Sequence, residues 1–174
     1  MTTTRIRSVL SAASVAGLTL TALMCLGAPS AHAAELALTD PSGDNQGVGL
    51  DILATELANN DYRVNVTIDY RVNRAGSTIV GLKARDRAVV RVVDQHKADG
   101  GGRTFLVNSD GDTISCRGLR SDWDKDDVEL TLSVPSTCLW NGNYGAVQPW
   151  VLTEPLKDGS DIDLLKTRQW IARG

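Results

Sequence analysis

The sequence predicts a mainly β fold: an antiparallel, jelly-roll-like β-sandwich of about eight short strands with one disulfide. Apolar and polar residues alternate over residues 62–70 and again over 128–134, which is typical of strands with one buried and one solvated face. Shorter β-branched segments recur between these stretches, separated by Gly, Pro, Asn and Asp residues that favour turns. No internal repeat or linker interrupts the pattern, so we expect a single domain.

The first 33 residues predict a secretory signal peptide, so the mature protein is expected to be secreted. Arg5 and Arg7 supply a positive start, and an apolar stretch follows from Val9 to Leu26. Ala31-His32-Ala33 then matches a small-x-small cleavage site. A retained membrane anchor is disfavoured because the apolar stretch is short, and lipid attachment is disfavoured because no small residue precedes Cys25.

Residues 34–174 are the predicted secreted domain. Without the leader, the domain has 16 basic and 21 acidic residues, a formal charge of −5. An acidic domain without a basic cluster is poorly suited to nucleic acid, whose binding depends on phosphate neutralisation, and no membrane span is expected in the mature protein. Cys116 and Cys138 are an even pair in an oxidising compartment. We therefore expect a disulfide that closes a loop of about 23 residues, which stabilises by about 3 kcal/mol.

Three strands are predicted in the first part of the domain. Glu35–Thr39 is the first, followed by a type I turn at Asp40-Pro41-Ser42-Gly43. Leu50–Ala58 fits either a short helix or a strand, and we favour the strand because a two-turn helix would have little to pack against. It would pair with residues 62–70 through a turn at Asn59-Asn60-Asp61. The residues expected on the buried face of that second strand are Tyr62, Val64, Val66, Ile68 and Tyr70.

Further strands are predicted in the second part, and prolines mark two of them. Pro135 ends the strand over 128–134, and Pro149 indicates an edge strand or a bulge. Asp161–Gly174 is either a helix or a final strand. The other predicted strands are Thr78–Ala84, Ala88–Val93, Thr104–Val107, Thr113–Leu119 and Ala146–Thr153. The core residues expected from the two alternating stretches are Val64, Val66, Ile68, Leu130, Leu132 and Val134.

Two short motifs carry a resemblance to secreted modules. Asp40-Pro-Ser-Gly-Asp44, followed by Asp51-Ile52 at the start of a strand, is similar to the start of β-sandwich modules of the DOMON and family 9 carbohydrate-binding type. The Cys116 and Cys138 pair, with the run Cys138-Leu139-Trp140, resembles small secreted actinobacterial β-sandwich proteins. The resemblance covers most of the domain in pattern and implies a sandwich with a ligand-binding face. It implies no catalytic residue, and no haem-ligand motif is matched.

Residues that carry catalysis are few. His96 is the single histidine after the leader, and it lies in a polar segment where we expect an exposed turn. No Gly-x-Ser-x-Gly or His-Glu-x-x-His motif is present. One histidine and a disulfide leave too few ligands for zinc. The enzymatic alternative is a small hydrolase that uses a pair of carboxylates, and no catalytic residue is assigned.

The densest charged feature is the acidic run Asp122–Glu129, with five acids in eight residues. Ca²⁺ binds carboxylate oxygens, so Asp122, Asp124 and Asp126 are the candidate metal ligands, and Ca²⁺ is the candidate cofactor if there is one. The spacing is not that of an EF-hand. The competing interpretation is a solvated acidic turn between two strands.

Trp123, Trp140 and Tyr144 are the candidate ligand-binding residues. Trp123 lies in the acidic run, and the other two flank a polar Asn-Gly-Asn loop. Flat rings beside amides and carboxylates are what sugar recognition uses. The competing interpretation is that these rings cover the disulfide and close one end of the sandwich. Trp150 and Trp170 lie in apolar patterns and are expected in the core.

These observations predict a secreted, non-catalytic binding module for a carbohydrate or a cell-envelope component. The alternatives are the carboxylate-pair hydrolase and a structural or protein-interaction module. Exposed tryptophans would favour ligand binding, and two carboxylates facing each other in a cleft would favour the enzyme. A large exposed apolar face would favour a protein partner.

Overall fold

The structure is a computed structural model that describes residues 34–41, 43–44, 49–156 and 162–174. These residues belong to one compact unit, Ala31–Gly174. The predicted leader lies outside the described residues, as do Ser42 of the predicted turn and Asp161. Across the described ranges, no helix combines the length and apolar composition needed to cross a membrane.

The described residues form twelve strands and two short 3₁₀ turns. The strands are β1 (Ala34–Thr39), β2 (Ile52–Asn59), β3 (Arg63–Tyr70), β4 (Gly76–Ala84), β5 (Val90–His96), β6 (Gly102–Val107), β7 (Thr113–Ile114), β8 (Arg120–Asp124), β9 (Glu129–Pro135), β10 (Ala146–Glu154), β11 (Asp163–Lys166) and β12 (Ile171–Ala172). The 3₁₀ turns are η1 (Ser136–Cys138) and η2 (Trp140–Gly142). The predicted strand Thr113–Leu119 is reduced to β7. The strand count exceeds the prediction because β8 is a polar, acidic segment without alternation, and because the C-terminal segment holds two short strands, β11 and β12.

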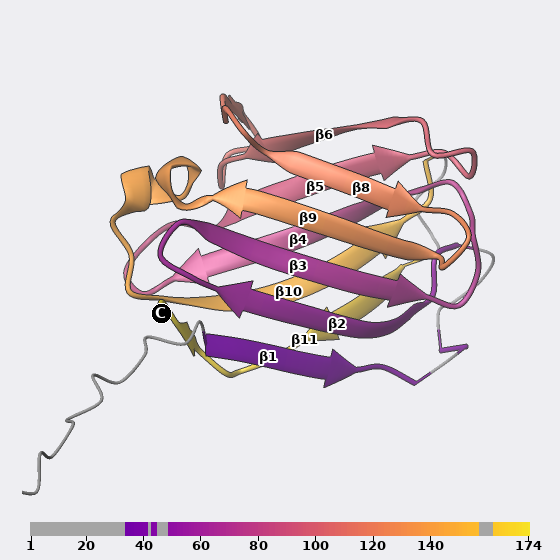
Figure 1. The fold of residues 1–174 in the computed structure, drawn as a ribbon, viewed down its shortest axis with the longest axis horizontal. Helices are drawn as coiled ribbons and strands as arrows, with labels where there is room; N and C mark the ends of the chain where they lie inside the picture. Colours follow the sequence, from indigo (N-terminus) through magenta and orange to yellow (C-terminus); the bar gives the residue numbers. More distant parts are fainter. Residues whose placement is uncertain (1–33, 42, 45–48, 157–161) are drawn as a thin grey trace, which may run out of the picture. The chain divides into compact units, whose positions relative to one another are not determined.

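Two antiparallel sheets pack against each other, which confirms the predicted β-sandwich (Figure 1). The five-stranded sheet has the order β1-β2-β3-β9-β8. The seven-stranded sheet has the order β11-β10-β4-β5-β6-β7, and β12 also pairs with β10. Neighbours such as β3 and β9, or β4 and β10, are far apart in sequence, so these pairings come from the tertiary fold.

The inner faces of the two sheets form the hydrophobic core that the alternating stretches predicted. Every core residue expected from the two alternating stretches is fully buried; they are Val64, Val66, Ile68, Leu130, Leu132 and Val134. Tyr62 is the exception among the residues expected on the buried face, because it is 81 % exposed and precedes β3. It lies in a turn where the Asn60 carboxamide oxygen accepts the backbone N–H groups of Tyr62 and Arg63.

The ambiguous segment after Leu50 is a strand, as favoured. Strand β2 pairs with β1 on one side and β3 on the other, with a bulge between Ile52 and Ala54. Ile52 and Leu57 reach the core, so β2 gains two hydrogen-bonded neighbours and apolar burial. A short isolated helix would have gained neither.

The prediction that Pro149 marks an edge or bulge is corrected by the position of β10. This strand lies between β4 and β11, inside the seven-stranded sheet. On the β11 side, β11 pairs from Trp150 onward and β12 pairs only with Ala146 and Val147. Pro149 falls in the gap between these two short partners, where no ladder N–H is needed.

The C-terminal segment, for which a helix and a final strand were both left open, forms the two short strands β11 and β12.

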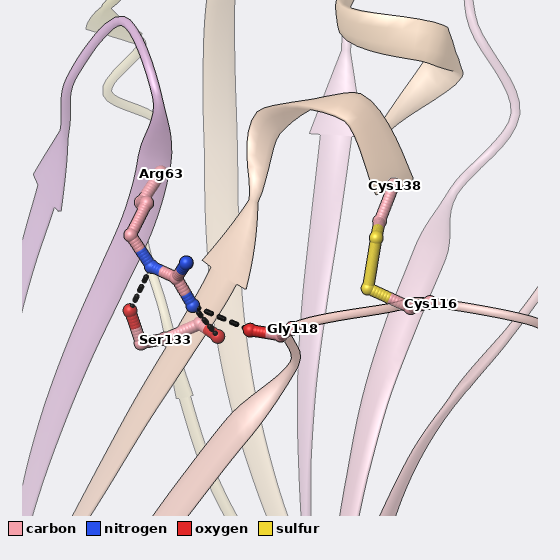
Figure 2. The surroundings of a disulfide bond; sticks show 5 residues. All are labelled: Arg63, Cys116, Gly118, Ser133 and Cys138. Atoms are coloured by element: carbon pink, nitrogen blue, oxygen red, sulfur yellow. Dashed lines mark hydrogen bonds between the residues drawn. A yellow bond between two sulfur atoms is a disulfide. The ribbon is translucent and has the colours of Figure 1, made fainter.

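The disulfide between Cys116 and Cys138 is present as predicted, with the two Cα atoms 5.4 Å apart. It joins the segment between β7 and β8 to η1, close to where the chain passes from one sheet to the other (Figure 2). Beside it, the Arg63 guanidinium donates to the Gly118 carbonyl at 2.7 Å and to the Ser133 carbonyl at 2.9 Å. The covalent bond and these hydrogen bonds together hold the start of β8 against β9 and β3.

Candidate functional site

The structure brings two of the three predicted ligand-binding aromatics together. The rings of Trp140 and Tyr144 meet edge to face with centroids 5.5 Å apart. Tyr144 is buried, and the indole N–H of Trp140 donates to the carbonyl of Ala88 at 3.0 Å. Arg173 lies over the Tyr144 ring at 4.9 Å from its centroid. Both rings therefore take part in packing next to the disulfide.

Trp123 does not join that pair. It lies on β8 opposite Leu130, near the end of β3, whereas Trp140 follows Pro135, which pairs with the first residue of β3. One strand length separates the two tryptophans. Trp123 instead stacks on His96 with ring centroids 3.8 Å apart.

His96 is buried, which corrects the prediction of an exposed turn histidine. It ends β5, where the strand alternation points it into the sandwich. Its Nδ1 lies 3.0 Å from an Asp94 carboxylate oxygen, and its Nε2 lies 3.1 Å from the carbonyl of Arg74. Each ring nitrogen therefore has an oxygen within hydrogen-bond distance, and the imidazole stacks on the Trp123 indole.

Asp94 is the carboxylate that pairs with this buried imidazole. Its second oxygen accepts the hydroxyls of Thr104 and Ser121, each at 2.6 Å. Burial alone would raise the pKa of Asp94, but the hydrogen bonds from His96, Ser121 and Thr104 outweigh burial and lower it. The Asp94 and His96 side chains are therefore held in an internal hydrogen-bond network, and both ring nitrogens of His96 already have partners.

The acidic run places its candidate calcium ligands along a strand and a turn. Asp122 and Asp124 belong to β8, while Asp126 lies in the turn before β9. The Asp124 carboxylate accepts the backbone N–H groups of Asp126 and Asp127, and these bonds lower its pKa. Calcium binding at this run stays a prediction. Among the described residues, the carboxylate oxygens that converge belong to Asp40, Asp44 and Asp163, outside the acidic run.

The outer face of the seven-stranded sheet carries an apolar row that the sequence analysis did not single out. Leu152 on β10 pairs with Leu164 on β11 and with Ile79 on β4. Ile79 pairs with Val93 on β5, and Val93 pairs with Phe105 on β6. Leu164 is 47 % exposed and the other four are partly buried. The row therefore crosses five strands on a face that is open to solvent in this unit.

Trp150 lies in the next row, which corrects its predicted place in the core. It pairs with Gly81 on β4 and Lys166 on β11, and Gly81 pairs with Arg91 on β5. A Cβ atom on Gly81 would lie only 1.9 Å from the indole Cε2, so the ring covers the glycine backbone. The partly exposed area of Trp150 therefore faces away from the sheet. Trp170 is also outside the core, being 37 % exposed and 5.5 Å from the Arg85 guanidinium.

A hollow surrounds the Trp150 ring, with apolar and hydrogen-bonding side chains at its margin. Its lining residues besides Trp150 are Lys83, Gln148, Pro149, Leu152, Leu164, Lys166 and Thr167. The Gln148 side-chain amide donates to the Thr167 carbonyl at 3.1 Å, which holds the amide beside the hollow. The combination of an aromatic platform, lysines and an amide is the composition expected of a ligand-binding surface.

Positive charge gathers on this outer face although the domain is acidic. The outward-facing cations of its strands are Lys83, Arg91, Arg103 and Lys166, against one acid, Glu154. A sequence signal for this face did exist. Strands β4 and β10 contain apolar residues at both alternating positions, which indicates two apolar faces, and a glycine inside a strand indicates a close approach.

No protein-family model, curated protein or solved structure matches this chain. The fold and the outer face define the class: a disulfide-linked antiparallel β-sandwich with an aromatic, cation-bearing sheet face. The resemblance to DOMON and family 9 modules stays a prediction.

Proposed function

We propose that the protein is an extracellular, non-catalytic binding module for an acidic polysaccharide, which it holds on the outer face of the seven-stranded sheet. The observation that carries the proposal is the position of Trp150 over Gly81, with cations on both sides in the same row. This surface takes the place of the Trp123, Trp140 and Tyr144 end as the candidate ligand-binding surface.

The Trp150 ring suits the stacking of a sugar because one side of the ring packs on the sheet and the other side faces outward. Sugar rings present a face of C–H groups that packs on an aromatic ring while their hydroxyls take hydrogen bonds at the margin. Gln148 and Thr167 supply such partners beside the ring. The ring is already held by Gly81, so little side-chain freedom is lost on binding.

The acidic character of the ligand follows from the charges around the ring. Lys166 lies directly across from Trp150, and residues paired in this way have Cβ atoms about 5 Å apart. Arg91 occupies the same row beyond Gly81, and Lys83 is diagonal to Trp150. A uronic acid stacked on the indole would therefore have a cation within reach of its carboxylate on either side.

The test is binding of polygalacturonate and hyaluronan, compared with the neutral polymers cellulose and laminarin, by calorimetry and affinity electrophoresis. We expect binding of at least one acidic polymer and of neither neutral one. Trp150→Ala should weaken binding about tenfold, equivalent to about 1.4 kcal/mol. Lys83→Gln with Lys166→Gln should weaken it and reduce its salt dependence. Tyr62→Ala is the matched control, because Tyr62 is an exposed aromatic on the turn before β3.

Three results would contradict the proposal. They are no binding of either acidic polymer, equal binding of neutral and acidic polymers, and binding that Trp150→Ala leaves unchanged.

A second candidate function is binding of a protein partner to the apolar row. This row favours a protein contact because its apolar side chains continue across five strands of the outer face. Ile79→Ser with Val93→Thr changes the centre of this row and leaves Trp150 and the lysines in place. A glycan site at Trp150 should tolerate this double variant. Self-association of the wild type that is abolished by the double variant, measured by light scattering, would instead support a protein contact.

A further inference from the structure

Three carboxylates converge at one edge of the sandwich, away from the acidic run. Asp40 follows β1, Asp44 lies in the next segment, and Asp163 begins β11. Each offers an oxygen, and these oxygens all lie within 4.8 Å of one another. Ca²⁺ holds its oxygen ligands at about 2.3–2.6 Å, so ligands on opposite sides of the ion are about 5 Å apart. The three oxygens therefore fit around a single ion.

A fourth carboxylate, Asp51, supplies a second and independent observation. Its side chain is fully buried. One of its oxygens accepts the Gly43 N–H at 2.8 Å and a charge-assisted bond from Arg71. Within the described residues, its other oxygen has no donor, and neither does the buried Oδ2 of Asp40. Buried acceptors without donors are costly, and here both belong to carboxylates that influence the same cluster.

Among the described residues, no ion pair balances the three converging carboxylates. Arg71 pairs with Asp51, which leaves Asp40, Asp44 and Asp163 without an ion-pair partner among the described residues. Burial, followed by the charges of Asp163 and Asp44, raises the pKa of Asp40 to about 6. Burial also raises the pKa of Asp163.

We propose that Asp40, Asp44 and Asp163, supported by Asp51, bind one Ca²⁺ ion. The three converging donors are carboxylates, which suit a hard cation, and no imidazole or thiolate belongs to the group. The inference is independent of the proposed glycan function.

The position of the ion explains what it would do. β1 is an edge strand of the five-stranded sheet, and β11 is an edge strand of the seven-stranded sheet. Asp163 already accepts the backbone N–H of Ile52 on β2 at 2.7 Å, which links the two sheets. An ion shared by Asp40 and Asp163 adds a second link across the same edge. It should therefore stabilise the folded domain by an amount that grows with the logarithm of the free Ca²⁺ concentration once that concentration exceeds the Kd.

The experiment is calorimetric titration of the chelator-stripped mature domain with CaCl₂, together with thermal unfolding in chelator and in millimolar Ca²⁺. The wild type should bind one ion and unfold at a higher temperature with Ca²⁺. Asp44→Asn removes an exposed ligand without touching the core, and Asp163→Asn keeps an acceptor for the Ile52 N–H. Each should weaken calcium binding at least tenfold. The matched control is Asp122→Asn with Asp124→Asn and Asp126→Asn, which should bind as the wild type does.

The outcomes separate this edge from the acidic run. A wild type with the same unfolding curve in chelator and in Ca²⁺ would overturn the proposal. So would calcium binding that survives both Asp44→Asn and Asp163→Asn, or binding that is lost only in the triple control. Mg²⁺ in place of CaCl₂ should produce a smaller shift, because Mg²⁺ gives up its water reluctantly. An equal or larger shift would assign the site to Mg²⁺ and overturn the choice of Ca²⁺.

Discussion

The indole of Trp150 covers the backbone of Gly81, and a Cβ atom at position 81 would lie 1.9 Å from the indole Cε2. The two residues are directly paired across β10 and β4. The absence of a side chain at Gly81 therefore decides where the largest ring on the outer face lies.

Gly81→Ala should displace Trp150 and destabilise the domain by about 1–3 kcal/mol, the usual cost of overpacking. The measurement is a urea unfolding midpoint combined with tryptophan fluorescence. Gly145→Ala is the control, because a Cβ at Gly145 meets no atom within 4 Å. Equal midpoints for Gly81→Ala and the wild type would mean that Trp150 moves aside at no cost.

Leu132→Ala should destabilise by about 2–5 kcal/mol, since Leu132 is fully buried between the sheets. Leu164→Ala offers the same chemical change at a residue that is 47 % exposed, and it should cost much less. Chemical denaturation of the two variants checks the comparison. Similar losses would show that the outer row is covered in solution, by a second copy for example.

The lowered pKa of Asp94 predicts an acid-dependent loss of stability. Its ionised form is favoured in the folded state, so its contribution is present above the ordinary value of 3.8 and is lost as the pH falls through the lower folded pKa. Asp94→Asn should cost about 3–5 kcal/mol at pH 7, as for a broken buried pair. The difference from the wild type should shrink below about pH 4 in urea titrations, whereas a constant difference would exclude this linkage.

Asp40 predicts the opposite pH dependence. Its folded pKa of about 6 lies above the ordinary 3.8, so its contribution is present at low pH and is lost as the pH rises through about 6. In chelator, Asp40→Asn should therefore gain stability relative to the wild type between about pH 4 and pH 7. Unfolding curves measured across that range provide the check. If the difference in unfolding free energy between Asp40→Asn and the wild type does not change with pH, the pKa of Asp40 is not raised in the folded protein.

The sequence by itself determined the strands, their buried faces and the disulfide, because each of these features is encoded by residues close together in the chain or by composition. The alternation over β3 and β9 predicted both strands and their buried residues, since successive side chains of a strand point to opposite faces. The even cysteine pair predicted the disulfide from composition and compartment. Turn residues and Pro135 marked where the strands end.

Only the tertiary structure decided which residues meet across the sheets. Trp123 and Trp140 are close in sequence, yet they lie one strand length apart because β9 runs between them. Asp40 and Asp163 belong to segments far apart in the chain, and they meet where the edges of the two sheets come together. His96 shows the same limit, because its polar neighbours suggested solvent while Asp94 and the Arg74 carbonyl satisfy it inside. Local pattern sets the faces of a strand, but strand order, which follows from burying those faces together, sets the neighbours of each side chain.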